Sequence, residues 1–213
     1  MWKDWKEALR NRQFRIYLLL SVLGLAAFAL LLPYFFNQVL LTKPGVQLND
    51  PVLFFFSPKD WSTEIFVILY CCAVLSIVLN LKSPKTFLIG AQVYVVVNFM
   101  RMISLYLFTL EAPVGIIPLN DPFLTHVAYG QSVYVKDLFF SGHISTLFLL
   151  FLIEERQLFK WFLLLSTACV AILLAWQRVH YTLDIIAAPA ITGLVFQFFH
   201  WFNQRIIFPK NSL

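Results

Sequence analysis

The sequence predicts an all-α integral membrane protein with six transmembrane helices and both termini in the cytoplasm. The first observation is composition: of 213 residues, 60% are hydrophobic and 13% are charged, with a mean hydropathy of +0.77. Soluble domains are about 25% charged, so a soluble chain of this size would leave much apolar surface in water. Lipid is therefore the expected solvent for most of the chain. The length fits one transmembrane domain over residues 1–213.

The second observation is a set of six apolar runs separated by polar segments. A helix needs about 20 residues to cross about 30 Å of hydrocarbon. Helices are expected because backbone groups in lipid must be satisfied within the segment, and no run alternates as a barrel strand would. The fourth and fifth runs are slightly short, and flanking residues are expected to complete them. The runs are Ile16–Phe36, Ile65–Leu81, Phe87–Leu110, Leu138–Ile153, Trp161–Trp176 and Ile185–Phe202.

The first run is predicted to be a retained helix rather than a signal peptide. It is long for the apolar region of a signal peptide, and no small-x-small cleavage site follows it in "PYFFNQVLL". Residues 1–15 mix Trp with basic residues in "WKDWKEALRNRQF", as an interfacial segment would.

The third observation is the distribution of Lys and Arg, which sets the orientation. Eleven of these residues flank the runs on the N-terminal side of the membrane, and four lie on the other side. Positive charge concentrates on cytoplasmic loops, so both termini are predicted to be inside. The segments 37–64, 111–137 and 177–184 then face outward. The net charge of +5 is explained by these boundary residues, and no nucleic-acid partner is expected.

Polar residues gather at the outer ends of the fourth and sixth runs. His180 and Asp184 are four residues apart and share a helix face, so the carboxylate can orient the imidazole and leave its other nitrogen free. Ser141, Gly142 and His143 open the helix predicted from the fourth run, and backbone N–H groups and a hydroxyl at a helix start bind anions well. Taken alone, each group is equally explained as a polar anchor at the membrane edge.

Arg101 lies inside the third run, in the outer half of the membrane. An intramembrane Arg is a candidate functional residue by default, although snorkelling to the headgroups is an alternative. Asn98 shares its helix face and is expected to help orient it. Arg178 is a second cation at the same edge, and the loop 110–123 is expected to be ordered and to border the site.

Two histidines, fixed cations and a helix N-terminus form a set suited to phosphoryl transfer. One histidine attacks phosphorus and the other protonates the departing oxygen, while the cations neutralise the equatorial oxygens. Cys71, Cys72 and Cys169 lie in apolar runs without metal-ligand spacing. No metal and no cofactor are therefore expected. His126 and His200 are expected to be bystanders.

"FSGHISTLF" and "HYTLD" together resemble the type 2 phosphatidic acid phosphatase superfamily, and most closely its sphingomyelin synthase branch. That branch has an aromatic residue before SGH and an H-Y-T-x-D sequence, as at 140–143 and 180–184, and an Arg, Thr and Pro pattern similar to "RMISLYLFTLEAP". The resemblance covers the predicted catalytic region, residues 95–200. It implies that His180 is the nucleophile, that Asp184 orients it, and that His143 is general acid and then base. It also implies six helices and an outward-facing site.

The chain departs from the phosphatase branch of that superfamily at several positions. Tyr94 and Met102 stand where that branch has the Lys and Pro of K-x6-R-P, and Phe140 replaces the Pro of P-S-G-H. Leu173 and Leu174 replace a Ser-Arg pair. These departures favour the synthase branch, with Arg101, Ser141, Gly142 and Arg178 as the predicted phosphate-binding residues.

The sequence therefore predicts an exoplasmic, metal-independent lipid phosphotransferase that moves a phospho-alcohol from a phospholipid to a ceramide-like hydroxyl. Its expected partners are membrane lipids: a phospholipid donor and a lipid alcohol or water as acceptor. A lipid phosphatase acting on a phosphatidic-acid-like phosphomonoester is the first alternative. A non-catalytic lipid-binding or transport protein is the second.

Overall fold

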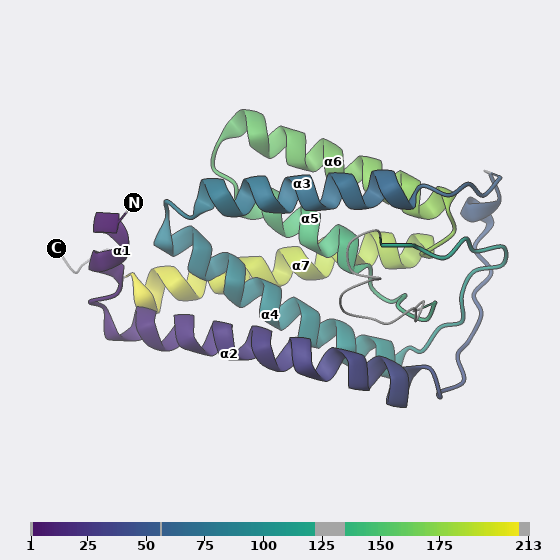
Figure 1. The fold of residues 1–213 in the computed structure, drawn as a ribbon, viewed down its shortest axis with the longest axis horizontal. Coiled ribbons are helices and arrows are strands. Elements are labelled where there is room, and N and C mark those ends of the chain that lie inside the picture. Colours follow the sequence, from purple (N-terminus) through teal and green to yellow (C-terminus); the bar gives the residue numbers. More distant parts are fainter. Residues whose placement is uncertain (1, 56, 122–134, 209–213) are drawn as a thin grey trace.

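Seven α-helices form most of the computed structural model, which describes residues 2–55, 57–121 and 135–208 (Figure 1). Two π-helical segments, Phe35–Leu40 and Asn203–Ile207, continue α2 and α7, and a 3-10 helix spans Pro51–Phe55. In these ranges a single bridge between Val46 and Leu110 is the one element of β pairing, so the all-α prediction is confirmed. The α-helices are α1 (Trp2–Ala8), α2 (Arg12–Tyr34), α3 (Ser62–Asn80), α4 (Pro84–Leu107), α5 (Gly142–Ile153), α6 (Gln157–Trp176) and α7 (Thr182–Phe202).

Five of the six predicted apolar runs lie in helices that are long and apolar enough to cross a membrane. The fourth run, Leu138–Ile153, differs from the prediction because only Gly142–Ile153 is helical. Twelve residues at 1.5 Å each span about 18 Å, well short of about 30 Å. The helix starts late because Ser141 caps it, and it ends at Glu154, whose backbone is extended. The segments long enough to cross are Arg12–Leu40, Ser62–Asn80, Pro84–Leu107, Gln157–Trp176 and Thr182–Ile207.

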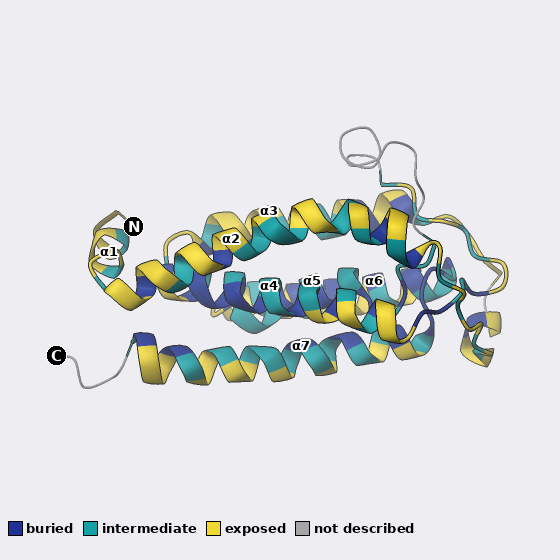
Figure 2. Cartoon of the chain, turned by 90° about the horizontal axis from the view of Figure 1, so that it is seen from below, coloured by how far each residue is buried: buried dark blue, intermediate teal, exposed yellow. Residues whose placement is uncertain are grey.

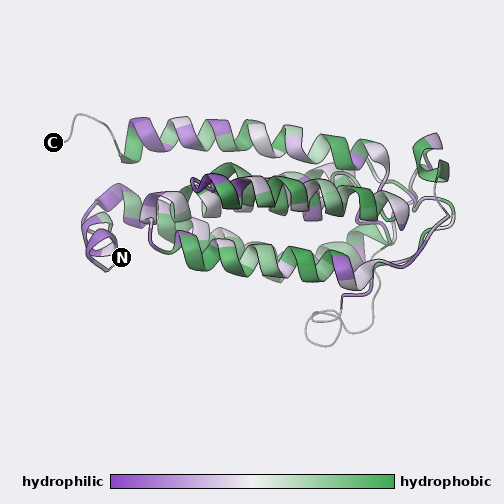
Figure 3. Ribbon diagram, turned by 90° about the horizontal axis from the view of Figure 1, so that it is seen from above, coloured by the Kyte–Doolittle hydropathy of each residue, from purple (hydrophilic) through white to green (hydrophobic). Residues whose placement is uncertain are grey.

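The short helix α5 lies at the centre of the bundle. It packs against α3, α4, α6 and α7, whereas α2 packs on the outside of α4. Ile144 and Leu147 of α5 are buried in the core together with Val93 and Leu174 from neighbouring helices. The outward faces of the other helices carry exposed apolar side chains (Figure 2; Figure 3). This apolar exterior is what lipid as a solvent requires.

Helix α1 and the end of α7 lie at the same end of the bundle (Figure 1). The indole of Trp5 donates to the carbonyl of Leu81 at 2.7 Å, and the side-chain amide of Asn11 donates to the carbonyl of Ile207 at 2.9 Å. The buried Glu154, which follows α5, binds Arg156 at 2.9 Å and Asn80, the last residue of α3, at 3.4 Å. The C-terminal ends of α5 and α3 therefore lie at the same height in the bundle. Because α1 and the end of α7 lie together, the described chain runs along the bundle an even number of times (Figure 1). That this end is cytoplasmic stays a prediction.

At the opposite end, which the sequence predicts to face outward and which is therefore called the outer end, α3, α5 and α7 begin and the loops between the helices converge (Figure 1). Lys136 binds Glu111 at 2.7 Å and also the carbonyl of Lys43. The Lys136 ammonium lowers the pKa of the Glu111 carboxyl. Because the pKa of Glu111 is lower in the folded protein, this contact stabilises the loops at pH values above the ordinary pKa of Glu. The stabilisation is lost as the pH falls through the lowered pKa of Glu111.

Gly24 sets the close approach of α2 to α4. A Cβ at this position would lie 2.7 Å from Cγ1 of Val95. Small residues permit such contacts between membrane helices. We expect Gly24→Leu to push α2 from α4 and to destabilise the protein by about 1–3 kcal/mol, measured by thermal unfolding in detergent. Ala29→Leu, on the exposed face of the same helix, is the control, and equal effects of the two variants would contradict this packing role.

Candidate active site

The two histidine motifs meet because the N-terminal ends of α5 and α7 lie side by side. The backbone N–H of Ser141 donates to the carbonyl of Asp184 at 3.2 Å. Ser141 also caps α5 through its hydroxyl, which accepts from the N–H of Ile144 at 3.5 Å. Asp184 closes the start of α7 by accepting from the N–H of Tyr181 at 3.0 Å. One backbone hydrogen bond therefore joins segments about 40 residues apart.

The rings of His143 and His180 lie close together in an edge-to-face arrangement. Their centroids are 6.1 Å apart and their planes are inclined by 68°. Nδ1 of the buried His180 lies 3.4 Å from Oδ2 of Asp184. The predicted contact is present, but the two residues do not share a helix face, because α7 starts at Thr182 and His180 precedes it. This contact leaves Nε2 of His180 as the nitrogen available for chemistry.

His143 is held by packing rather than by a carboxylate. Its ring stacks edge-to-face on Phe66 of α3 with centroids 5.6 Å apart. Its Nδ1 is enclosed and has no hydrogen-bond partner within the described ranges. The two histidines therefore stand in different environments, as a nucleophile and a proton carrier would need to.

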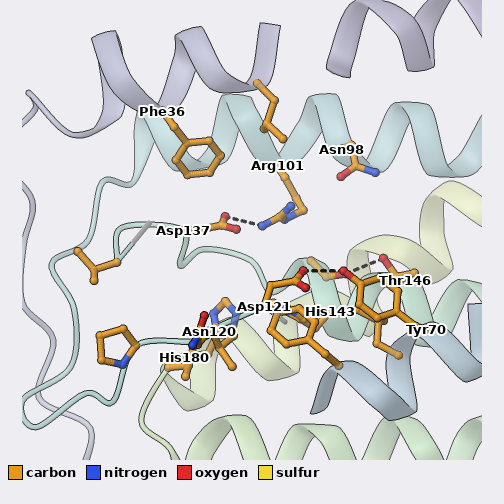
Figure 4. Close-up of a pocket in the computed structure, with 18 of the residues that line it drawn as sticks. Phe36, Tyr70, Asn98, Arg101, Asn120, Asp121, Asp137, His143, Thr146 and His180 are labelled. Carbon is orange, nitrogen blue, oxygen red and sulfur yellow. Dashed lines mark hydrogen bonds and ion pairs between the residues drawn. The ribbon is translucent and has the colours of Figure 1, made fainter. Parts of the chain in front are cut away.

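Arg101 is buried inside the bundle instead of reaching the headgroup region. Its Nε donates to the carbonyl of Phe140 at 2.8 Å, and its Nη2 binds Oδ1 of Asp137 at 2.5 Å. The guanidinium lies directly on Gly142, where a Cβ would come within 2.6 Å of Cζ. Only glycine therefore permits Arg101 to lie against the first turn of α5. Figure 4 shows Arg101 pointing toward Asp137.

A cavity of about 430 Å³ connects these residues. Apolar side chains of α2, of α3 and of the loop residues Ile116, Pro118 and Leu119 line it together with polar groups, several of which are labelled in Figure 4. The polar and histidine side chains that line it are Tyr70, Tyr94, Asn98, Arg101, Asn120, Asp121, Asp137, His143, Thr146 and His180.

The cavity is recessed below the start of α3. The inner ends of α3 and α5 are level, but α3 has 19 residues and α5 has 12. The start of α5 therefore lies about 10 Å deeper than the start of α3. Residues of the 116–121 segment fill the space above it and line the cavity. The sequence-based expectation that this loop borders the site is confirmed for that segment, and residues 122–123 lie outside the described ranges.

Two predicted phosphate-binding residues lie away from the cavity. Ser141 is fully buried behind the start of α5. Arg178 has a positive φ of 60°, and its guanidinium binds the carbonyls of Leu53 and Val114 in the outer loops. The structure therefore groups Arg101 and Gly142 with the histidines, but it does not bring Ser141 or Arg178 to them.

Other sequence-based expectations have mixed outcomes. The side-chain amide of Asn98 donates to the carbonyl of Tyr94 at 2.8 Å, one turn back on the same helix. His200 is exposed and stacks on Phe196 far from the cavity, whereas His126 lies outside the described residues. Over the parts of the chain that are described, no three His, Cys, Asp or Glu side chains are grouped so as to hold a metal.

Sequence reasoning missed Asp137, Asp121 and Tyr70. Asp137 lies four residues before Ser141, so its proximity to the SGH motif was the available signal. Tyr70 donates to Asp121 at 2.5 Å, a contact between a membrane helix and a distant loop. No local pattern identifies that pair.

Comparison with known proteins adds one finding. The family model described as PAP2 superfamily C-terminal matches residues 136–201. The matched region holds both histidines, Asp184 and Asp137. No curated protein is significantly similar to the chain. The family match, together with five helices apolar enough to cross a membrane, supports a membrane enzyme of the type 2 phosphatidic acid phosphatase superfamily, with lipid phosphatase or phosphotransferase activity.

Proposed function

We propose that the protein is a lipid phosphotransferase that moves a phospho-alcohol headgroup from a phospholipid to a lipid hydroxyl such as that of ceramide. The observation that carries the proposal is the pair of histidine rings, 6.1 Å apart, which line one cavity with a buried arginine. A phosphorus atom between the rings would have a nucleophile on one side and a proton donor on the other. Phosphoryl transfer needs this in-line arrangement.

The first half-reaction releases the lipid part of the donor. Nε2 of His180 attacks phosphorus, the bond from phosphorus to the diacylglycerol oxygen breaks, and His143 donates its proton to that oxygen. Asp184 accepts from Nδ1 of His180 and stabilises the positive charge that develops on the ring. The products are diacylglycerol and a phospho-alcohol bound to His180.

Charge on the phosphoryl oxygens is balanced by Arg101 and by the start of α5. The guanidinium lies against Gly142, so a phosphate held there also meets the N–H groups of the helix N-terminus. Such fixed donors stabilise charge in the transition state without reorganisation.

The charges that line the cavity favour a phosphodiester over a phosphomonoester. Arg101 is the one Lys or Arg among the lining residues of known placement, whereas Asp121 and Asp137 are both present. A phosphomonoester carries up to two negative charges near neutral pH, and a phosphodiester carries one. Since like charges in a partly desolvated site repel strongly, the diester is the better substrate, and headgroup transfer is favoured over phosphatase action.

The inner part of the cavity suits the hydrocarbon chains of lipids. Phe28 and Leu32 of α2 and Leu69 and Ala73 of α3 line it. An apolar lining with a few convergent polar groups is typical of small-molecule sites. The donor and acceptor are therefore proposed to be membrane lipids, and the distribution of Lys and Arg in the sequence favours a site on the exoplasmic face.

Purified protein incubated with labelled phosphatidylcholine and ceramide tests this function. We expect equal amounts of diacylglycerol and headgroup-bearing ceramide, and slow reaction with phosphatidic acid because of the two aspartates. Free phosphate from phosphatidic acid as the main phosphorus product would favour the phosphatase alternative. Diacylglycerol with only free headgroup phosphate would indicate lipase-like hydrolysis.

Substitution of His143 separates the general acid from the nucleophile. We expect His143→Gln to slow the natural first half-reaction by about 10²–10⁴-fold, because the alkoxide leaves without a proton. A phosphodiester with a p-nitrophenyl leaving group needs no such proton, so release of p-nitrophenol should fall much less. An equal loss with both substrates would contradict the acid role of His143. His200→Gln is the matched control, because that ring is exposed and distant.

A further inference from the structure

A buried glutamine joins three segments beside the candidate site. Gln177 follows α6 and is fully buried. Its Oε1 accepts from the backbone N–H of Trp61 at 2.8 Å. Its Nε2 lies 3.0 Å from the hydroxyl of Ser62 and 3.1 Å from the carbonyl of Ile117, and donates to both. The side chain therefore holds the start of α3 and the outer loop to the corner between α6 and α7.

Gln177 binds both backbone groups of Ile117, which belongs to the outer-loop segment 116–121. The N–H of Ile117 donates to the backbone carbonyl of Gln177 at 3.1 Å, while the carbonyl of Ile117 accepts from the Gln177 side chain. The N–H of Asn120 donates to the hydroxyl of Ser62 at 3.2 Å, and Tyr70 binds Asp121 at 2.5 Å. Five of the six residues of this segment line the cavity on its outer side. Gln177 thus fixes the wall between the histidines and the outside.

This wall matters because water competes with the lipid acceptor. On the basis of the proposed function, the headgroup bound to His180 is released when an oxygen attacks phosphorus. The new P–O bond forms, the P–N bond breaks with its electron pair returning to Nε2 of His180, and the proton of the attacking hydroxyl moves to His143. A lipid alcohol gives transfer and a water molecule gives hydrolysis, through otherwise identical steps. Exclusion of water therefore decides the product.

We propose that Gln177 is a positioning residue that clasps the 116–121 segment over the cavity and thereby sets the ratio of transfer to hydrolysis. Gln177 does not touch the reacting atoms. It lies three residues before His180, so it fixes the position of the 116–121 segment relative to the chain that carries the nucleophile. The buried amide has both a donor and an acceptor in use, and neither a carboxylate nor an apolar side chain of similar size can make all of these bonds.

The test measures both products from one reaction with phosphatidylcholine and ceramide. Gln177→Met retains most of the side-chain volume but removes the hydrogen bonds. We expect hydrolysis relative to transfer to rise by at least about 5-fold, because the loss of one ordinary buried hydrogen bond alone corresponds to about this factor. Ser62→Ala, which removes the hydroxyl shared by Gln177 and Asn120, should shift the ratio in the same direction by less. Gln38→Ala, at an exposed position near the same end of the bundle, should leave it unchanged.

A second measurement keeps the proposal independent of the activity assay. Hydrogen exchange of the peptide covering 112–121 should be faster in Gln177→Met than in the wild type and unchanged in Gln38→Ala. Unchanged exchange would overturn the clasp, and a proportional loss of both products at a constant ratio would overturn its role in product choice. A wild-type protein that produces no headgroup-bearing ceramide would instead refute the proposed function, and the exchange data would still decide whether Gln177 holds the segment.

Discussion

The arrangement of the site depends on the contact between the first turns of α5 and α7. The N–H of Ser141 donates to the carbonyl of Asp184, and each of these residues also closes the start of its own helix. Because both helix starts are fixed to each other, His143 and His180 are fixed as well. Backbone groups buried among apolar helices must find partners, so this contact is costly to break. The distance between the rings is thus a property of the bundle and not of two flexible side chains.

Burial of Arg101 follows from the same arrangement. A charged side chain among membrane helices is tolerated when it is paired and its N–H groups are used. Asp137 and the carbonyl of Phe140 provide these partners, and Gly142 provides the space. All three belong to the segment that leads into α5. Because α5 is short, Arg101, the N-terminus of α5 and the two histidines lie at one depth, about 10 Å below the outer end of α3. Loop residues can cover them there.

The sequence predicts much of this organisation from local patterns. Apolar runs identify the helices because hydrocarbon leaves no alternative to internal backbone hydrogen bonds. The four-residue spacing of His180 and Asp184 predicts their contact, although His180 lies just before α7 and not on its face. The late start of α5 was not predicted, because Leu138, Phe139 and Phe140 are as apolar as the helix that follows. The prediction that Arg178 binds phosphate relied on its proximity to His180 in the sequence. Such proximity does not show where a side chain points, and Arg178, whose φ is positive, directs its guanidinium to the outer loops. Asp121, Tyr70 and Gln177 depend on contacts between distant segments, which no single-sequence pattern contains.

Identification of the covalently modified residue tests the central claim most directly. The protein is mixed with phosphatidylcholine in the absence of an acceptor, quenched in alkali to preserve a phosphorus–nitrogen bond, digested and examined by mass spectrometry. We expect a phospho-alcohol on the peptide containing His180 in the wild type and in His143→Gln supplied with an activated donor. Attachment to His143, or turnover with no adduct on either histidine, would contradict it.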